Sequence, residues 1–124
     1  MIYVAYGKEQ DYFIDFVENA LGILAKEDYA SFISIFDSSR LSEHDLVLAL
    51  RYLDISCPIL KIDDPKLVKS KKQNICLFAF NDGSGYYMDY DLTTDGAIND
   101  LTIQIEFLKK AEGYIAVLDD LHTL

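Results

Sequence analysis

Three runs in the last third of the chain alternate apolar with polar residues, and they restrict the fold more than any other feature of the sequence. The runs are residues 86–92, 101–108 and 114–118, and the segments between them are rich in Asp, Gly and Asn. A period of two is typical of antiparallel strands with one buried face and one face toward water or a partner. The sequence therefore predicts an antiparallel sheet over this third of the chain.

The N-terminal part of the chain predicts helices. Over residues 9–26 apolar residues recur at spacings of three and four, which gives one apolar helical stripe. A short helix is expected over residues 28–36, and a third helix over residues 42–54. Ser42 is the expected N-cap of that third helix, because Asp45 follows it three residues later in a capping-box-like pattern.

The remaining segments are less regular. Residues 1–8 allow either a short strand or a disordered lead into the first helix, and residues 55–62 either an edge strand or an extended crossing around a proline. Residues 63–73 predict a polar, Lys-rich loop, and residues 74–80 a further strand. We therefore predict one α+β domain over residues 1–124, in which N-terminal amphipathic helices pack on a curved, cone-like antiparallel sheet.

The charge of the chain narrows the classes of partner. The formal net charge is −10, and no Lys or Arg occurs between Gln73 and Leu108. An acidic surface repels nucleic-acid phosphates and anionic membranes, and it attracts cationic proteins. Nucleic acid and membrane partners are thus disfavoured. No segment has the pattern of a signal peptide or of a membrane span, so a cytoplasmic location is expected.

The sequence predicts no metal site, no cofactor and no catalytic residue. His44, Cys57, Cys76 and His122 are zinc-ligand types, but they lack the paired short spacings of zinc sites. Neither His is placed by sequence to activate Cys57, and the two cysteines are expected to be separate core thiols. No glycine-rich phosphate-binding motif is present.

Polar residues on two neighbouring runs are expected to share one face of the sheet. Asp89 and Asp91 lie two residues apart, and in register with Thr102, Gln104 and Glu106 they form a polar patch opposite the apolar face. This patch has three interpretations: a solvated face, a docking surface for a basic protein, and a general acid and base pair in a cavity. A calcium site is conceivable, but the spacing differs from that of the EF-hand loop.

Two features of the chain resemble known families. The order of helices followed by a patterned sheet resembles the nuclear-transport-factor-two-like fold, in which a curved, cone-shaped sheet wraps a long helix. The C-terminal pattern Y-D-L, D-G, N-D-L-T, E-F and L-D-D-L-H, within residues 90–122, is similar to the closing segment of small bacterial domains among the immunity proteins of toxin delivery systems, such as contact-dependent growth inhibition. The resemblance implies a cytoplasmic protein that binds a cognate toxin domain, often a cationic nuclease, and blocks its active site or substrate groove.

The leading hypothesis is therefore a non-catalytic immunity or antitoxin protein that binds a basic toxin, as a monomer or weak homodimer. The predicted partner-binding residues are Asp82, Asp89, Asp91, Asp95, Asp100 and Glu106 for electrostatic steering, and Tyr86, Tyr87 or Tyr114 as aromatic anchors. One alternative is a small-molecule-binding protein or isomerase-like enzyme, with a carboxylate base and a tyrosine donor in a cone-shaped pocket. Another is a homodimeric adaptor that buries its sheet face against itself.

Overall fold

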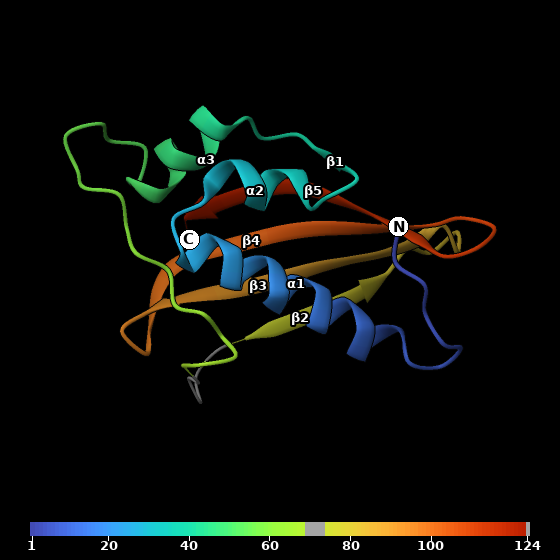
Figure 1. The fold of residues 1–124 in the computed structure, drawn as a ribbon. Helices are drawn as coiled ribbons and strands as arrows, with labels where there is room; N and C mark the ends of the chain where they lie inside the picture. The colour runs from blue at the N-terminus through green and yellow to red at the C-terminus, as the bar shows by residue number, and fades with distance from the viewer. Residues whose placement is uncertain (69–73, 124) are drawn as a thin grey trace.

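The structure is a computed structural model, and it describes residues 1–68 and 74–123. Helices lie on one side of a single open sheet, so the predicted α+β class is confirmed (Figure 1). In chain order the elements are α1 (Glu9–Ala25), α2 (Tyr29–Ser34), β1 (Ser38–Ser39), α3 (Glu43–Leu50), β2 (Ile75–Ala79), β3 (Gly85–Thr94), β4 (Ala97–Lys109) and β5 (Tyr114–Thr123).

The long helix α1 agrees with the predicted helix and lies along the sheet. Phe13 of α1 stacks on Phe107 of β4 with the ring centroids 4.1 Å apart, and it meets Tyr114 of β5 edge-on at 5.0 Å. Further along the helix, a Cβ added at Gly22 would lie 3.1 Å from the Asp64 side chain. Gly22 therefore allows the side-chain carboxylate of Asp64, in the loop before β2, to approach α1 closely.

Side-chain caps begin the two shorter helices, as predicted. The Asp28 carboxylate accepts a hydrogen bond from the Ser31 N–H at 3.1 Å at the start of α2. At the start of α3 the Ser42 hydroxyl accepts from the Asp45 N–H at 3.0 Å, and the Asp45 carboxylate accepts from the Ser42 N–H at 3.1 Å. These reciprocal bonds satisfy backbone donors that the helix itself leaves without acceptors, so the predicted capping box is confirmed.

The segment between α3 and β2 agrees with the prediction in part. The helix α3 ends earlier than predicted, because Tyr52 and Leu53 adopt left-handed backbone with φ of 54° and 61°. Residues 55–62 form turns and an extended crossing, which is one of the two predicted alternatives. Of the predicted loop at residues 63–73, residues 69–73 lie outside the described residues, and the remainder is a loop.

The sheet has five strands in the order β1-β5-β4-β3-β2, and β2 to β5 pair antiparallel. The predicted strands are therefore confirmed, whereas β1 is an addition that pairs parallel to β5. The N-terminal segment joins the sheet at an isolated bridge between Ile2 and Tyr114. At the start of β3, Gly85 has a φ of 152°, and a Cβ there would lie 2.0 Å from the Phe107 carbonyl oxygen of the neighbouring strand β4. This close approach of the two backbones requires glycine.

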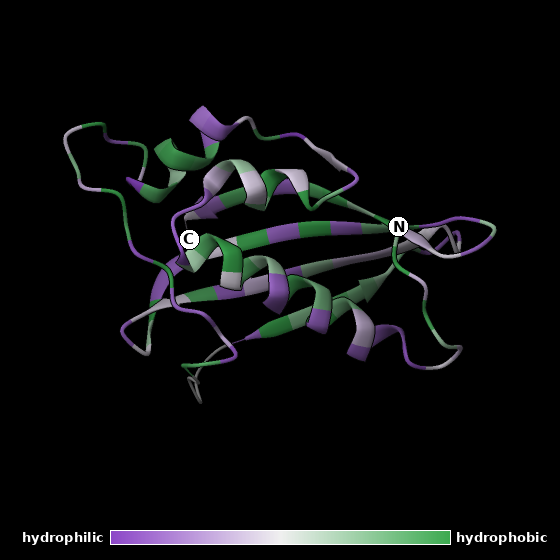
Figure 2. Ribbon diagram, viewed as in Figure 1, coloured by the Kyte–Doolittle hydropathy of each residue, from purple (hydrophilic) through white to green (hydrophobic). Residues whose placement is uncertain are grey.

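The two faces of the sheet differ in chemistry, and the strands alternate hydrophobic with hydrophilic residues (Figure 2). The side toward the helices contributes core residues that are each at most 4% exposed: Met88, Tyr90, Leu92, Leu101, Ile103, Ile105, Phe107, Ala116, Leu118 and Leu121. We call the side away from the helices the outer face. By register it carries Cys76, Phe78, Tyr87, Asp89, Asp91, Thr102, Gln104, Glu106, Leu108, Val117, Asp120 and His122.

Both cysteines are free thiols, as predicted, but their burial differs from the prediction. Cys57 is half-buried, whereas Cys76 is exposed. The expectation of a core thiol is therefore wrong for Cys76, because β2 is at the edge of the sheet and this residue points to the outer face.

Candidate protein-binding site

The outer face is organised in rows that run across the strands. One row consists of Phe78, Tyr87, Glu106 and Val117, and the next of Cys76, Asp89, Gln104 and Asp120. A third row contains Asp91, Thr102 and His122. The face therefore changes from aromatic and apolar near the β2–β3 hairpin to polar and acidic farther along the strands, and the predicted polar patch is confirmed as a shared face.

Cross-strand hydrogen bonds orient the polar side chains of the outer face. Gln104 Nε2 donates to Asp89 Oδ1 at 2.9 Å, and Thr102 Oγ1 donates to Asp91 Oδ1 at 2.8 Å. A carboxylate has several acceptor positions, and one hydrogen bond leaves most of them available. The Asp89 carboxylate is thus fixed by the sheet and can still accept hydrogen bonds from a partner.

A basic residue from outside the C-terminal third reaches the outer face. Arg40, which follows β1, places Nη1 3.0 Å from Glu106 Oε1 and also contacts Asp119 Oδ1. Hydrogen bonds to these two carboxylates, with their charges, raise the pKa of the Arg40 guanidinium. The expectation of an acidic surface without counter-charge is therefore corrected at Glu106. The physical reason is β1, whose pairing with β5 is continued by the hydrogen bond from the Arg40 N–H to the Leu118 carbonyl at 2.9 Å.

The β5 side of the outer face adds two carboxylates that the sequence analysis did not assign. Asp119 contacts Arg40, and Asp120 Oδ2 lies 3.7 Å from His122 Nδ1. The register shifts within β5, so Leu118 and Leu121 both lie in the core although they are three residues apart. Simple alternation fails at such a bulge, which is why the sequence did not reveal Asp119 and Asp120.

Three aromatic rings lie at the apolar end of the outer face. Phe78 stacks on Tyr87 with the ring centroids 4.8 Å apart, and Phe80 lies 5.8 Å from the same ring. Phe78 is 43% exposed. Exposed aromatic rings next to polar groups are typical anchors of protein interfaces. Tyr87 therefore lies on the outer face, as its predicted role as an aromatic anchor requires. Phe78 and Phe80 contact its ring and were not predicted.

The other two predicted anchors lie on the helix side of the sheet. Tyr114 is 8% exposed and its ring packs against Phe13, while the ring of Tyr86 lies 5.5 Å from Phe13. Their assignment to the acidic face is therefore wrong. Each lies two residues from a core residue, Met88 or Ala116, so the same alternation that defines the strands already assigns both tyrosines to the core side.

Three of the predicted aspartates lie at the ends of the sheet instead of on the outer face. Asp82 is in the turn between β2 and β3, where its carboxylate accepts from the Ser84 N–H at 2.9 Å, and hydrogen bonds with Ser84 lower the pKa of Asp82. Asp95 and Asp100 lie at the opposite end, near the β3–β4 turn, with φ of 52° and 66°. The six predicted acidic residues therefore form no single patch, because Asp82 and Asp95 lie in turns and Asp100 lies at an irregular position with positive φ near the start of β4.

A family model matches residues 23–124, a range that contains the whole sheet and every predicted site residue. The chain belongs to the DUF7668 family. The family is described as a domain of unknown function. No curated protein and no solved structure matches the DUF7668 chain. The matched range begins close to the end of α1, so most of this helix lies before it.

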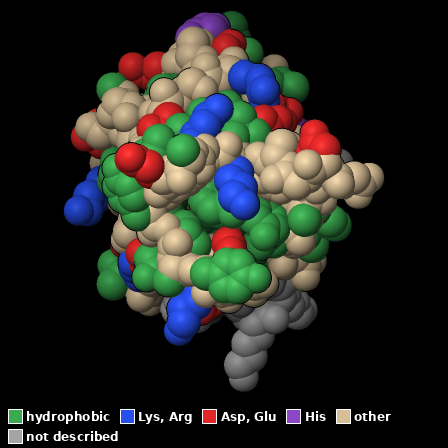
Figure 3. Space-filling model, turned by 90° about the vertical axis from the view of Figure 1, so that its right-hand side faces the viewer, with side chains coloured by type: hydrophobic (Ala, Val, Ile, Leu, Met, Phe, Trp, Pro, Cys, Tyr) green, Lys and Arg blue, Asp and Glu red, His purple; other side chains and the backbone are tan. Residues whose placement is uncertain are grey.

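One depression of the DUF7668 chain, of about 350 Å³, lies between the N-terminal segment and the β4–β5 hairpin. Its lining includes Tyr6, Tyr86, Tyr114, Lys109 and Lys110. Figure 3 views this end of the molecule, where Lys and Arg side chains lie among apolar and acidic ones. Tyr86 and Tyr114 thus border a depression whose lining carries both lysines and the carboxylates of Glu9 and Glu112, and not the outer face.

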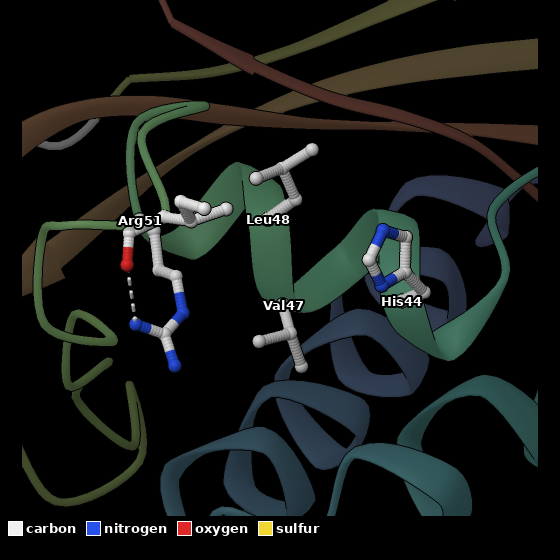
Figure 4. A pocket seen from close by; sticks show the side chains of 5 residues that line it. His44, Val47, Leu48 and Arg51 are labelled. Carbon is white, nitrogen blue, oxygen red and sulfur yellow. Dashed lines mark hydrogen bonds between the residues drawn. The ribbon is translucent and has the colours of Figure 1, made fainter.

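A second depression, of about 260 Å³, lies along α3 and is lined by His44, Val47, Leu48, Arg51 and Ile55 (Figure 4). Arg51 Nη1 donates to the carbonyls of Ile55 at 3.3 Å and Cys57 at 2.8 Å, so backbone groups hold its guanidinium. The lining contains neither a carboxylate nor a nucleophilic side chain. The imidazole of His44 therefore lines this depression beside apolar side chains and the guanidinium of Arg51.

Metal-ligating side chains are dispersed in the part of the chain that the structure describes. Within residues 1–68 and 74–123, no group of three or more His, Cys, Asp or Glu side chains is arranged to hold a metal ion. The described helices also include none with the length and apolar character needed to cross a membrane.

Proposed function

We propose that the chain is a non-catalytic cytoplasmic protein that neutralises a basic partner, of the toxin-immunity kind, by stoichiometric binding through its outer face. The observation that carries the proposal is the composition of that face. Five carboxylates lie on or reach it, and a stacked aromatic pair, the exposed Phe78 and the half-buried Tyr87, lies at one end. The carboxylates are Asp89, Asp91, Glu106, Asp119 and Asp120. A face with this composition combines electrostatic steering with aromatic anchoring.

Electrostatics determines the kind of partner. The chain has a net charge of −10, and the outer face adds carboxylates held in fixed positions by Gln104 and Thr102. Such a face attracts a protein surface rich in Lys and Arg, and the association rate falls with added salt. A surface that binds nucleic-acid phosphate has the same positive charge, so a nuclease-type toxin domain is a partner that this face fits.

Geometry also favours binding over chemistry on this face. Antiparallel strands give a broad surface on which side chains stand in rows across the strands, and neighbours within a row are about 5 Å apart. Gln104 separates the carboxylate of Asp89 from that of Asp120 in one row, and Thr102 separates Asp91 from His122 in the next. This arrangement suits contact with a complementary protein surface more than enclosure of a small substrate.

One observation favours the alternative of a small-molecule-binding or isomerase-like protein. The Tyr90 hydroxyl donates to Glu18 Oε2 at 2.7 Å between β3 and α1, which is a carboxylate and tyrosine pair of the predicted kind. Tyr90 is 0% exposed, however, and the core around it is formed by fully buried apolar side chains. The pair is a part-buried hydrogen bond that joins α1 to β3, and this alternative is the weaker one.

Capture experiments with a genomic neighbour test the proposal. The purified chain is used as bait for the product of the reading frame directly upstream of its gene, at about 50 mM and about 200 mM salt. The proposal predicts a stoichiometric complex at the lower salt concentration that weakens at the higher one. Absence of a complex at both concentrations would remove the immunity interpretation. A thermal-shift response to small carbonyl compounds that is lost in Glu18→Gln would favour the enzyme alternative instead.

A further inference from the structure

The strand β2 forms one margin of the sheet and is exposed on both of its faces (Figure 1). The run Ile75–Ala79, continued by Phe80, contains only apolar residues, without any charge or proline. Ile75 is 37% exposed and Phe78 is 43% exposed. Exposed edge strands normally carry Lys, Pro or a bulge that prevents pairing with another chain. This edge carries none of these over its strand residues, so it is suited to pair.

The hydrogen bonds to β3 identify the backbone groups that β2 leaves available. The Phe80 N–H donates to the Gly85 carbonyl, and the Asn74 carbonyl accepts from the Asp91 N–H, so residues 74 and 80 direct their backbone groups toward β3. In an antiparallel ladder these directions alternate along the strand. The N–H and C=O groups of Ile75, Leu77 and Ala79 therefore point away from the sheet.

We propose that a second copy of this chain pairs with β2, antiparallel and about a two-fold axis at Leu77. The available backbone groups are arranged symmetrically about this residue. Leu77 then bonds with its own copy, and Ile75 bonds with Ala79 of the second copy in both directions. Each available N–H finds a carbonyl and each carbonyl an N–H, so the edge is complementary to itself, as an isologous interface requires.

The side chains of β2 are also compatible with a copy of themselves. On the helix side, Leu77 lies opposite its copy, and Ile75 opposite Ala79. On the outer face, Cys76 lies opposite Phe78, whose ring already stacks on Tyr87. Each of these cross-strand pairs is apolar, and such pairs stabilise antiparallel ladders.

The charge of the chain does not prevent this pairing. The carboxylates nearest to β2 on the outer face are on β3. Adjacent strands are about 4.8 Å apart. The two β3 strands of a dimer are therefore about 14 Å apart, more than the Debye length of about 8 Å at physiological salt. Mutual repulsion is then largely screened, so added salt leaves dimerisation unchanged or strengthens it. The proposal is independent of the proposed function, whose complex weakens with salt.

The size of the interface sets the expected affinity. An edge of five strand residues buries much less surface than the roughly 1,200 Å² at which stable interfaces begin. We therefore expect a dimer with a dissociation constant on the order of 10–100 µM.

Sedimentation equilibrium and disulfide trapping test the dimer. We expect the intact chain to pass from monomer to dimer between about 5 and 500 µM. Leu77→Lys places two charges against each other at the axis and keeps the chain monomeric. The matched control is Leu67→Lys, because Leu67 is 82% exposed and lies outside β2, and this variant still dimerises.

Trapping tests the register without adding charge. In a Cys57→Ser, Cys76→Ser background, Leu77→Cys is expected to form a disulfide-linked dimer under mild oxidation, because opposed Cα atoms of a hydrogen-bonded pair are about 5.5 Å apart. Ala79→Cys crosslinks only when mixed with Ile75→Cys. A chain that stays monomeric at the highest concentration, or a dimer that Leu77→Cys does not trap, would overturn the proposal.

Discussion

Arg40 Nη1 lies 3.0 Å from Glu106 Oε1, although Arg40 precedes α3 and Glu106 is in the middle of β4. Asp119 of β5 contacts the same guanidinium nitrogen. This contact places a positive charge among the carboxylates of the outer face. Arg40 therefore limits how strongly the outer face attracts a cationic partner.

Removal of this positive charge is expected to strengthen binding of cationic molecules. Arg40→Ala should bind a fluorescent Lys-rich peptide about threefold more tightly at low salt, because the substitution removes a positive charge that repels the peptide beside the carboxylates of the outer face. Fluorescence anisotropy measures the affinity. Lys110→Ala is the control, since it makes the same change in net charge in the β4–β5 hairpin. Equal effects of the two substitutions would mean that net charge, and not the outer face, governs binding.

Substitution of Tyr114 by alanine should lower the free energy of unfolding more than the same substitution at Tyr87. Tyr114→Ala removes a buried ring that packs on Phe13, and we expect the free energy of unfolding to fall by about 3 kcal/mol. Tyr87→Ala removes a ring on the outer face and should cost about 1 kcal/mol. Urea unfolding followed by far-UV circular dichroism measures both. A larger loss for Tyr87→Ala would contradict the assignment of the two faces.

Asp63 is expected to hold the β3–β4 turn in place. Its carboxylate accepts hydrogen bonds from the Thr93 hydroxyl at 2.8 Å, the Asp95 N–H at 3.0 Å and the Gly96 N–H at 2.8 Å. Asp63→Ala leaves these donors without their acceptor and should destabilise the chain by about 2 kcal/mol. Hydrogen exchange should accelerate at Asp95 and Gly96 first. Exchange that is unchanged at these amides would show that the turn does not depend on Asp63.

Asp37 should make the stability of the chain fall in acid. Burial acts to raise the pKa of Asp37, but hydrogen bonds from the Ala116 N–H and the Met1 amino group, and the charge of that group, hold it below its ordinary value. A carboxyl whose pKa is lower in the folded state stabilises the fold above its unfolded pKa of about 3.9 and loses this effect as pH falls through the folded pKa.

The test of Asp37 compares unfolding at two pH values. Between about pH 6 and pH 3, the intact chain should lose more stability than Asp37→Asn, because the variant has no carboxylate to protonate. The urea midpoint at each pH gives the comparison. Equal losses for the two proteins would indicate that Asp37 carries no such linkage.

Local patterns predicted most of the elements of this fold. The apolar stripe of α1, the capping box at Ser42 and the alternation in β3 and β4 each depend on neighbouring residues, and all three are present in the structure. The shared face of Asp89 and Gln104 followed from the same alternation, whereas their direct pairing came only with the register of the strands. Local physics was sufficient in these cases because burial of one face selects the period of the pattern.

The features of the fold that could not be predicted from the sequence depend on pairing between segments far apart in the chain. The strand β1 consists of two residues and pairs with β5 far along the chain, so it is too short to show a sequence period. The pairing of β1 with β5 brings Arg40 to the outer face. The shift of register at Asp119 likewise breaks the alternation that would have assigned this residue. Tyr86 shows a different failure, since it has the same parity as Met88 and the alternation of the strand already assigned it to the core side.

Removal of two carboxylates from the outer face, compared with removal of two elsewhere so that both variants have the same net charge, tests most directly the central claim that the outer face binds a basic protein. Asp89→Asn with Asp120→Asn removes two carboxylates that flank Gln104, whereas Glu27→Gln with Glu112→Gln removes two exposed carboxylates elsewhere. Isothermal titration calorimetry measures the affinity of each double variant for the product of the upstream reading frame, at about 50 mM salt. The account predicts at least about a tenfold loss for the outer-face pair and less than about a twofold change for the control pair. Equal losses in the two variants, or full affinity in the outer-face variant, would contradict it.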